Sequence, residues 1–495
     1  MVKEPLTRRK ASKPVARSPL LAPPVQREIC LELQDNSFSQ QSAIQFFGLR
    51  NIFRDAAPAA ARLAEQFENH NRSLFQLMDV RFTRNYDGDD VYVTLEAGNV
   101  VGAVPLFSPT SGMLDYGLVI QPRFPWPGVG PMLAEMGWRV APTPLRLPLL
   151  KRSERKVPAW VISSMVLARL RTLLDALARR FEVITEVRSA PRGTINWSSY
   201  VTRHLATGQF LSIPCSFPDL QDDRFLAGAI RYALEKQRGA LESQREHGAF
   251  VHQLIAFCDE LLRRVQRCPV FMPPPNMLSA WLQRPLRMQS FRDGLQAIEW
   301  TIEDRGLAGI SDLEGIPWRM PMEQFFEAWL EVVFHNVARE MGAQVRTGRK
   351  RETVHAMHWE PSYVGAQNSL IPDLWLDCGA MTVIVDAKYK RHWEELEDAS
   401  LGSLDDAIRE QHRHDIFQVL AYANLARTSR VVVCLAYPCT PDTWVRMCER
   451  KRVVHKADIS VGTRSVALWL TAVPMATSVE KISRVLVPEL RAAAT

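Results

Sequence analysis

Alternating apolar and polar positions predict a β-hairpin in the last third of the chain. Residues 382–385 are apolar or β-branched, as is typical of a strand, and residues 374–377 are expected to be its partner. The connection Cys378-Gly379-Ala380 is short and contains the glycine that a tight reversal needs. The pattern therefore predicts two antiparallel strands with charged residues at their open end.

The register of this hairpin decides which charged side chains meet. If the turn is centred between Gly379 and Ala380, Asp373 lies opposite Asp386, because both are equally distant from the centre. Directly opposed residues project from one face with Cβ atoms about 5 Å apart. Strand alternation returns Lys388 to that same face. We therefore expect two carboxylates and an ammonium group to converge.

This trio is suited to the hydrolysis of a phosphodiester. Hard divalent cations such as Mg²⁺, or Mn²⁺, take oxygen ligands and keep several waters, so two carboxylates are enough to hold one. Such an ion polarises the phosphate and acidifies a water, and a nearby lysine offsets the developing charge. The alternative interpretation is a buried hairpin with ordinary charges at its ends.

A second stretch of the chain satisfies the same loose formula of Pro-Asp followed by an acid and a lysine. There Pro441-Asp442 precedes Glu449-Arg450-Lys451. The stretch lacks β-branched alternation and is rich in charges, so it is expected to form a solvated helix or loop. The choice between the two motifs therefore depends on the segments that flank each of them.

Helices are predicted on both sides of the hairpin. Upstream, apolar residues recur with a helical period, and Glu327 near the start of this helix is a candidate third metal ligand; the alternative is a first-turn acid favoured by the helix dipole. Downstream, Asp415, Gln418 and Tyr422 share one helix face. The amide and the phenol are candidates to bind phosphate or hold the lysine; the alternative is a half-buried polar stripe.

The order of these motifs resembles the PD-(D/E)xK nuclease superfamily. The ordered set is Phe326-Glu327 on a helix, Pro372-Asp373 and Asp386-Ala387-Lys388 on strands, Gln418 with Tyr422 on a helix, and then the strand RVVVCLAYP. Within the superfamily, DAKYK followed by DIFQVLAYA is most similar to McrC, the nuclease subunit of methylcytosine-dependent restriction systems. The nuclease resemblance covers about residues 320–440, and similar segments occur in the McrC order at 116–124, 191–197 and 213–234.

The resemblance implies a role, a fold and a set of site residues. The role is that of a Mg²⁺-dependent DNA endonuclease subunit in a restriction or anti-phage defence complex. The fold is a restriction-endonuclease-like mixed sheet flanked by helices. The implied catalytic residues are Asp373, Asp386, Lys388, Gln418 and Tyr422, and the implied metal ligands are Glu327, Asp373 and Asp386.

A separate motor is also implied, because McrC-like subunits work with an AAA+ GTPase or ATPase, expected here as a hexameric ring. The chain itself has no Gly-x-x-x-x-Gly-Lys-Ser/Thr loop for nucleotide phosphates. Residues 28–315 are then expected to dock on the motor and stimulate it. Two alternatives stay open: a standalone RecB-like or Cas4-like DNA exonuclease in repair, and a non-catalytic scaffold or activator.

The net charge of +7 lies mainly in one tail. Residues 1–27 contain seven Lys or Arg and one acid, and their Pro-rich composition predicts a disordered segment that adds salt-sensitive affinity for DNA or is simply solvated. A second basic cluster lies between the Glu327 helix and the Asp373 strand. Its members are expected to grip DNA phosphates beside the site: Arg346, Arg349, Lys350 and Arg351.

Length and composition indicate the class of protein and its division into domains. The 495 residues, 46% of them hydrophobic, favour a multidomain α/β protein, α+β overall. Scattered cysteines favour neither a zinc site nor a disulfide framework. The N-terminus lacks a signal-peptide pattern and no apolar run reaches the ~18 residues of a membrane span, so a cytoplasmic protein is expected. The expected divisions are a basic tail (1–27), a mixed partner-docking domain (28–190), a mainly helical segment (191–315) and a nuclease domain (316–495).

Overall fold

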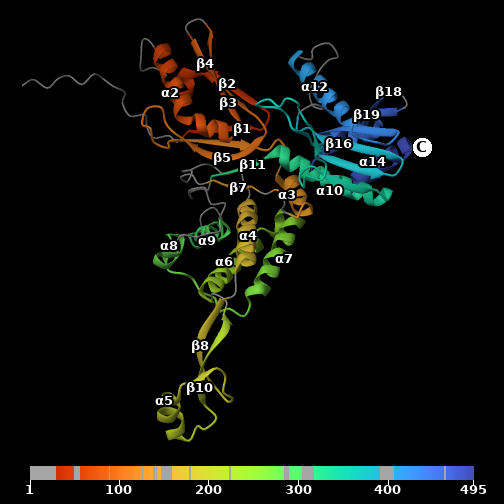
Figure 1. Cartoon of the computed structure of the whole chain (residues 1–495). Coiled ribbons are helices and arrows are strands. Elements are labelled where there is room, and N and C mark those ends of the chain that lie inside the picture. Colours follow the sequence, from red (N-terminus) through yellow and green to blue (C-terminus); the bar gives the residue numbers. More distant parts are fainter. Residues whose placement is uncertain are drawn as a thin grey trace, which may run out of the picture.

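A computed structural model gives the arrangement of the chain. It describes residues 29–494 except 50–55, 88–89, 125, 138–139, 141, 146–158, 178–179, 222–223, 284–288, 304–316, 391–405 and 462–463. Figure 1 shows two β-rich lobes side by side, a helical stem below them, and a long hairpin that projects from the stem. The basic tail predicted at residues 1–27 lies outside the described residues.

The N-terminal lobe contains a five-stranded sheet and a three-stranded sheet. Its elements are β1 (Ile29–Gln34), β2 (Phe38–Ser42), α1 (Ala43–Phe46), α2 (Ala56–Leu77), β3 (Val80–Asp87), β4 (Asp90–Ala97), β5 (Val100–Leu106), β6 (Tyr116–Gln121), α3 (Trp126–Glu135), β7 (Thr143–Pro144) and β11 (Trp318–Pro321). The larger sheet has the order β1-β6-β5-β11-β7, with β1 and β6 parallel and the other neighbours antiparallel. The smaller sheet, β2-β4-β3, is antiparallel. Because β1 and β6 are parallel, both strands end at the same edge of the sheet, and this arrangement is important for the site described below.

The stem is a group of helices around α4. Its elements are α4 (Ala159–Ala176), α6 (Arg224–Glu242), η3 (Arg245–His247), α7 (Ala249–Val265), α8 (Pro275–Gln283) and α9 (Gln289–Ile302). α4 packs against α6, α7 and α9, and residues 160–167 of α4 are all buried. α6 and α7 are separated at residues 243–248, where Gly248 has φ of +125°.

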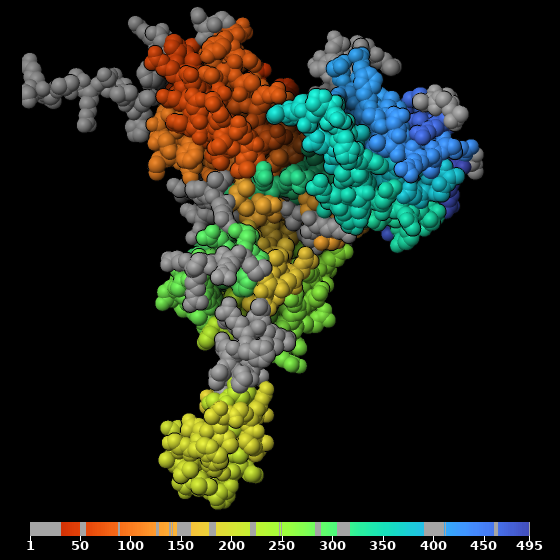
Figure 2. All heavy atoms as spheres, in the orientation of Figure 1, coloured from red at the N-terminus to blue at the C-terminus, as the bar shows by residue number. Residues whose placement is uncertain are grey.

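The projecting hairpin, here called the arm, comprises residues 180–221. Its elements are β8 (Arg180–Arg188), β9 (Thr194–Ile195), α5 (Trp197–Ser199), η1 (Tyr200–His204), η2 (Leu205–Thr207) and β10 (Ile213–Gln221). The tip of the arm lies far from both lobes (Figure 2). The prediction of a mainly helical segment is wrong for β10, which pairs with β8 along its whole length. β9 pairs only with Cys215 and Ser216, so most of the second edge of β10 has no strand partner among the described residues, as is typical of a strand that contains prolines.

The C-terminal lobe is built on a six-stranded mixed sheet. Its elements are α10 (Met322–Met341), β12 (Gln344–Thr347), β13 (His355–Ala356), β14 (Ser369–Leu370), β15 (Leu374–Cys378), β16 (Met381–Ala387), α12 (Asp406–Ala423), β17 (Arg430–Cys439), α13 (Pro441–Glu449), β18 (Val454–Val461), β19 (Arg464–Pro474) and α14 (Val479–Ala494). The sheet order is β12-β15-β16-β17-β19-β18, in which β16, β17 and β19 are parallel and the other pairs antiparallel. α10 packs against α14, β15 and β16, whereas α12 packs against β16 and β17.

The two lobes are joined by the direct passage from β11 into α10. β11 was predicted within the nuclease domain (316–495), but it pairs with β5 and β7 in the N-terminal sheet, where both of its edges find partners. The amide of Met322 then donates to the carbonyl of Asn99, 2.8 Å away. The helix that carries Glu327 is therefore anchored to the N-terminal sheet.

The described residues form a mixed α/β protein with several sheets, as expected from the sequence. Their buried apolar side chains make one cluster that includes both lobes and the stem. In the described part of the chain, no helix has the length and apolar character that a membrane crossing requires.

The junction of β5 and β11 yields a stability prediction. A Cβ atom at Gly102 would lie 2.2 Å from the carbonyl oxygen of Trp318, and the φ of Gly102 is +153°. Gly102→Ala should therefore lower the stability of the protein by about 1–3 kcal/mol, as overpacking does. The measurement is the midpoint of thermal or urea unfolding.

A glycine in α6 is the matched control. A Cβ atom at Gly239 meets no atom within 4 Å, so Gly239→Ala should leave the stability unchanged or raise it by up to about 1 kcal/mol. Equal midpoints for the two variants would contradict the close approach of β5 and β11.

Candidate active site

β15 and β16 form the predicted hairpin in the predicted register. Cys378 pairs with Met381, which centres the turn where the sequence placed it. Gly379 has φ of +75°, a conformation that favours glycine. At the open end, Asp373 and Asp386 directly follow the last strand pair, so the two aspartates stand opposite one another.

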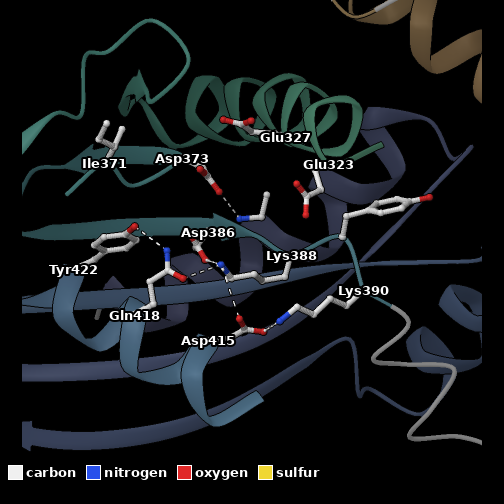
Figure 3. Close-up of a pocket in the computed structure, with 12 residues that line it drawn as sticks. Glu323, Glu327, Ile371, Asp373, Asp386, Lys388, Lys390, Asp415, Gln418 and Tyr422 are labelled. Carbon is white, nitrogen blue, oxygen red and sulfur yellow. Dashed lines mark hydrogen bonds and ion pairs between the residues drawn. The ribbon is translucent and has the colours of Figure 1, made fainter. Parts of the chain in front are cut away.

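A pocket of about 300 Å³ lies at this open end. It is lined by residues from the start of α10, the start of β15, the end of β16 and the middle of α12 (Figure 3): Glu323, Glu327, Ile371, Asp373, Asp386, Ala387, Lys388, Tyr389, Lys390, Asp415, Gln418 and Tyr422. Every residue predicted to be catalytic is in this set. The pocket is therefore rich in carboxylates and also contains two lysines.

The two aspartates are held close to one another in a poorly solvated place. The backbone N–H of Ala387 donates to Oδ2 of Asp373 at 2.6 Å, which ties Asp373 to β16. Burial raises the pKa of Asp373 well above its usual range, and the neighbouring carboxylates of Asp386 and Glu327 raise it further. Burial also raises the pKa of Asp386, although Lys388 opposes this. The site thus concentrates negative charge that needs a cation.

Lys388 provides one such cation from within the chain. Its Nζ lies 2.7 Å from Oδ2 of Asp386 and 3.9 Å from Oδ1 of Asp415. Burial lowers the pKa of Lys388, but Asp386, Asp415 and Asp373 together raise it above its ordinary value. Lys388 is therefore a positively charged donor that points at the carboxylates (Figure 3).

Gln418 and Tyr422 hold this lysine from the opposite side. Nζ of Lys388 donates to Oε1 of Gln418 at 2.9 Å, and Nε2 of Gln418 donates to the Tyr422 hydroxyl at 2.9 Å. Because an ammonium group can only donate, it fixes the orientation of the Gln418 amide. The helix face predicted from the spacing is thus turned toward the pocket, and its amide contacts the lysine.

Glu327 lies on the α10 side of the pocket. Burial raises its pKa, as do Glu331 and Asp386, while Arg349 lowers it. Within the described residues, no three His, Cys, Asp or Glu side chains are placed to hold one metal ion. The predicted ligand set of Glu327, Asp373 and Asp386 therefore does not form a closed cage. The donor chemistry fits a hard divalent cation held by the two aspartates, with water as its remaining ligands.

Asp415 and Lys390 are among the pocket residues that received no role from the sequence. Asp415 is buried, and its Oδ2 accepts from Nζ of Lys390 at 2.6 Å and from the Tyr437 hydroxyl at 3.3 Å. Its spacing from Gln418 on one helix face was the available signal. Lys390 could have been found as the second lysine of the DAKYK segment, two places after Lys388. Asp415 thus joins both lysines of the pocket to α12.

The basic cluster lies beside the pocket without lining it. The amide of Gly348 donates to the carbonyl of Asp373 at 2.8 Å, so the turn after β12 adjoins the site. Arg346 pairs with Asp377 at 3.1 Å, and Arg349 pairs with Glu331 at 3.4 Å. The remaining two members, Lys350 and Arg351, are exposed. DNA binding by these four basic residues stays a prediction.

The second Pro-Asp motif forms a helix instead of a hairpin. Pro441 begins α13, where the Thr440 side chain accepts from the amide of Thr443. Asp442 is an acidic residue of the first turn, as the helix dipole favours. Neither Asp442 nor Glu449 lines the pocket, so the structure separates the two motifs as the strand pattern predicted.

Fold and pocket define a class: an α/β protein with an acidic, lysine-containing site at the end of a mixed sheet. The family model described as "McrBC 5-methylcytosine restriction system component" matches residues 132–438. The chain belongs to this family, as its resemblance to McrC predicted. No curated protein matches the chain.

Two solved structures show a weaker likeness. One is a half-complex of Thermococcus gammatolerans McrB AAA+ hexamers with bound McrC, at 13% identity and a TM-score of 0.38, covering 94% of this chain and 99% of that chain. The other is the McrBC complex of the same organism, at 12% identity and a TM-score of 0.24, covering 62% of this chain and 88% of that chain. These scores are too low for a comparison of individual elements.

The crowding of carboxylates predicts how stability depends on pH without metal. Because the pKa of Asp373 is raised above its ordinary value of 3.8, the folded protein binds this proton more tightly than the unfolded chain does. Stability in EDTA should therefore fall as the pH rises from about 4 through the raised pKa. Asp373→Asn should remove this loss and raise the unfolding midpoint at pH 7.

Thermal unfolding in EDTA between pH 4 and pH 8 measures the effect. Asp442→Asn, outside the pocket, is the control and should follow the wild type. If the unfolding midpoints of the wild type and Asp373→Asn differ by the same amount at every pH, the pKa of Asp373 is not raised in the folded protein.

Proposed function

We propose that the C-terminal lobe is a PD-(D/E)xK nuclease domain that cleaves DNA with Mg²⁺ or Mn²⁺. One observation carries the proposal: Asp373, Asp386 and Lys388 meet in one pocket, and Lys388 contacts both Asp386 and Gln418. The succession of α10, the β15–β16 hairpin, α12 and β17 supports it, because the site residues follow one another in the order of the superfamily motifs.

Each side chain has a role in this proposal. Asp373 and Asp386 would hold the ion, with Glu327 as a further carboxylate at the same pocket. When bound, the ion supplies the positive charge that polarises a phosphodiester and acidifies a water. Lys388 orients the attacking water and offsets charge that develops on the phosphate. Gln418 and Tyr422 keep the lysine in place, and the exposed Lys350 and Arg351 bind flanking phosphates.

The rest of the chain is proposed to dock on an AAA+ NTPase. Membership in a restriction-system family supports a partner of this kind, and the structure of the arm supports a docking surface. Large apolar side chains are exposed at its tip: Trp197 (63%), Phe210 (62%) and Leu211 (74%). The Tyr200 hydroxyl donates to the carbonyl of Phe210 at 2.8 Å, which keeps the tip together. Exposed apolar groups on a projecting element are typical of an interaction surface.

Cleavage assays with matched variants test the nuclease. Asp386→Ala and Lys388→Ala should each reduce metal-dependent cleavage of DNA by about 10³-fold or more, because they remove charge stabilisation at the reacting phosphate. Folding and motor binding should be retained. Glu449→Ala and Lys451→Ala, from the second motif, should cleave like the wild type.

Two outcomes would overturn this assignment. Equal loss of cleavage in the Glu449 and Lys451 variants would move the site to α13. Full cleavage by Asp386→Ala would exclude the proposed chemistry and favour a scaffold or activator role.

A motor assay tests the docking surface. The double variant Phe210→Ala with Leu211→Ala should weaken binding to the AAA+ partner about tenfold or more, as the loss of buried apolar anchors does, and should abolish stimulation of NTP hydrolysis. Met272→Ala removes an exposed apolar side chain (53%) from the stem and is the control.

The nuclease-dead Asp386→Ala variant should still stimulate the motor. If no AAA+ protein copurifies with the wild type and the lone chain cleaves DNA ends at full rate without nucleotide, a standalone exonuclease replaces the restriction subunit.

A further inference from the structure

A buried polar cluster connects the N-terminal sheet to the segment that carries the pocket lysines. Asp35 follows β1 and Arg123 follows β6, and since these strands are parallel, both residues emerge at the same edge of the sheet. The amide of Asp35 donates to the carbonyl of Gln121 at 3.0 Å, and the amide of Arg123 donates to Oδ1 of Asp35. The cluster is thus built into the backbone of the sheet.

Tyr389 reaches this cluster from the other lobe. Its hydroxyl donates to Oδ2 of Asp35 at 2.7 Å. The guanidinium of Arg123 lies 4.6 Å from the centre of the Tyr389 ring, and its Nη2 donates to the carbonyl of Lys390 at 3.1 Å. Phe326 of α10 packs on the same ring with a centroid distance of 6.2 Å. The Tyr389 side chain and the Lys390 carbonyl are therefore held by residues of the N-terminal lobe.

The clamped residues are next to the functional lysines in sequence. Lys388 and Lys390 flank Tyr389, and both line the pocket. The amide of Lys388 donates to the carbonyl of Ala436 at 2.9 Å, which is the contact that continues the pairing with β17. Past this point Arg123 and Asp35 hold the Lys390 carbonyl and the Tyr389 hydroxyl, while the Lys390 side chain is bonded to Asp415. The segment is thus fixed partly by a contact between residues 354 positions apart in sequence.

The energetics favour a geometric role for the cluster. The Asp35 side chain is 0% exposed and that of Arg123 is 7%, with 3.7 Å between Nε of Arg123 and Oδ2 of Asp35. Burial raises the pKa of Asp35, which Arg123 and the Tyr389 hydroxyl counteract. Buried ion pairs contribute little net stability, because desolvation offsets their attraction. Their hydrogen bonds are directional, however, and fix a position that apolar packing would leave free to slide.

We propose that Asp35 and Arg123 are positioning residues for the pocket lysines: through Tyr389 and the Lys390 carbonyl they hold Lys388 against Asp386, so that cleavage depends on correct seating of the N-terminal lobe. The link to cleavage rests on the proposed nuclease function, whereas the positioning of Lys388 can be measured by itself.

Lysine reactivity in the full-length protein tests the positioning directly. Tyr389→Phe keeps the ring and removes only the hydroxyl that bonds to Asp35. In this variant, acylation of Lys388 by a water-soluble amine reagent, followed by mass spectrometry, should rise several-fold relative to the wild type. Lys456, 38% exposed and paired with Glu489, is the internal reference and should not change. Amide hydrogen exchange of the peptide covering 386–390 should accelerate in parallel.

Cleavage kinetics test the consequence. Tyr389→Phe and Asp35→Ala should each lower kcat about tenfold or more, because small misplacement of a reacting group is costly, while KM for DNA stays unchanged. The double variant should lose little beyond Asp35→Ala alone, since Asp35→Ala already removes the contact that Tyr389→Phe removes. Arg123→Lys should recover part of the kcat that Arg123→Ala loses. Arg81→Ala, from an exposed ion pair with Glu96 in the same lobe, is the control.

The outcomes separate the two proposals. Unchanged acylation and exchange at Lys388 in Tyr389→Phe would overturn the positioning role, whatever happens to cleavage. A lower unfolding midpoint, a loss of all activities and a higher KM in the same variant would also overturn the positioning role. That result would indicate a general structural role for the cluster. If acylation rises as expected but the wild type cleaves no DNA, the positioning holds and the nuclease function is wrong.

Discussion

The antiparallel pairing of β15 with β16 is the constraint on which the candidate site depends. The pairing places Asp373 and Asp386 opposite one another, and a slip by one residue would move one of them to the other face of the sheet. The slip is prevented because β16 is also paired with β17, and its residues from Met381 to Asp386 are all buried. Strand packing therefore forces together two buried acids. Burial raises the pKa of both, and nearby carboxylates raise it further: Asp386 and Glu327 for Asp373, and Asp415 for Asp386.

This hairpin is held in a larger frame that spans both lobes. α10 starts directly after a strand of the N-terminal sheet and brings Glu327 to one side of the pocket. On the other side, α12 contributes Gln418 and Asp415 to the two lysines. The end of β16 meets Asp35 of the N-terminal lobe. The position of the pocket residues therefore depends in part on the N-terminal lobe.

Local patterns predicted the hairpin well, because a two-strand unit is specified by alternation and by the glycine at its turn. The helix face of Gln418 and Tyr422 was also predictable from spacing. Contacts between distant segments were not: nothing local shows that Tyr389 bonds to Asp35, or that β11 joins the N-terminal sheet. The Asn71 side chain of α2 likewise both donates to and accepts from the backbone of Phe107, 36 positions away in the sequence.

We propose that Asp373 and Asp386 together hold a divalent cation within reach of Lys388. Anomalous scattering from crystals grown with Mn²⁺ tests this proposal, because it locates the ion without assumptions about activity. We expect a peak bonded to one carboxylate oxygen of each aspartate, at about 2.0–2.3 Å as expected for small hard cations, with Lys388 still against Asp386. A peak bonded to Asp442 or Glu449, or a pocket that stays without manganese at millimolar concentration, would contradict it.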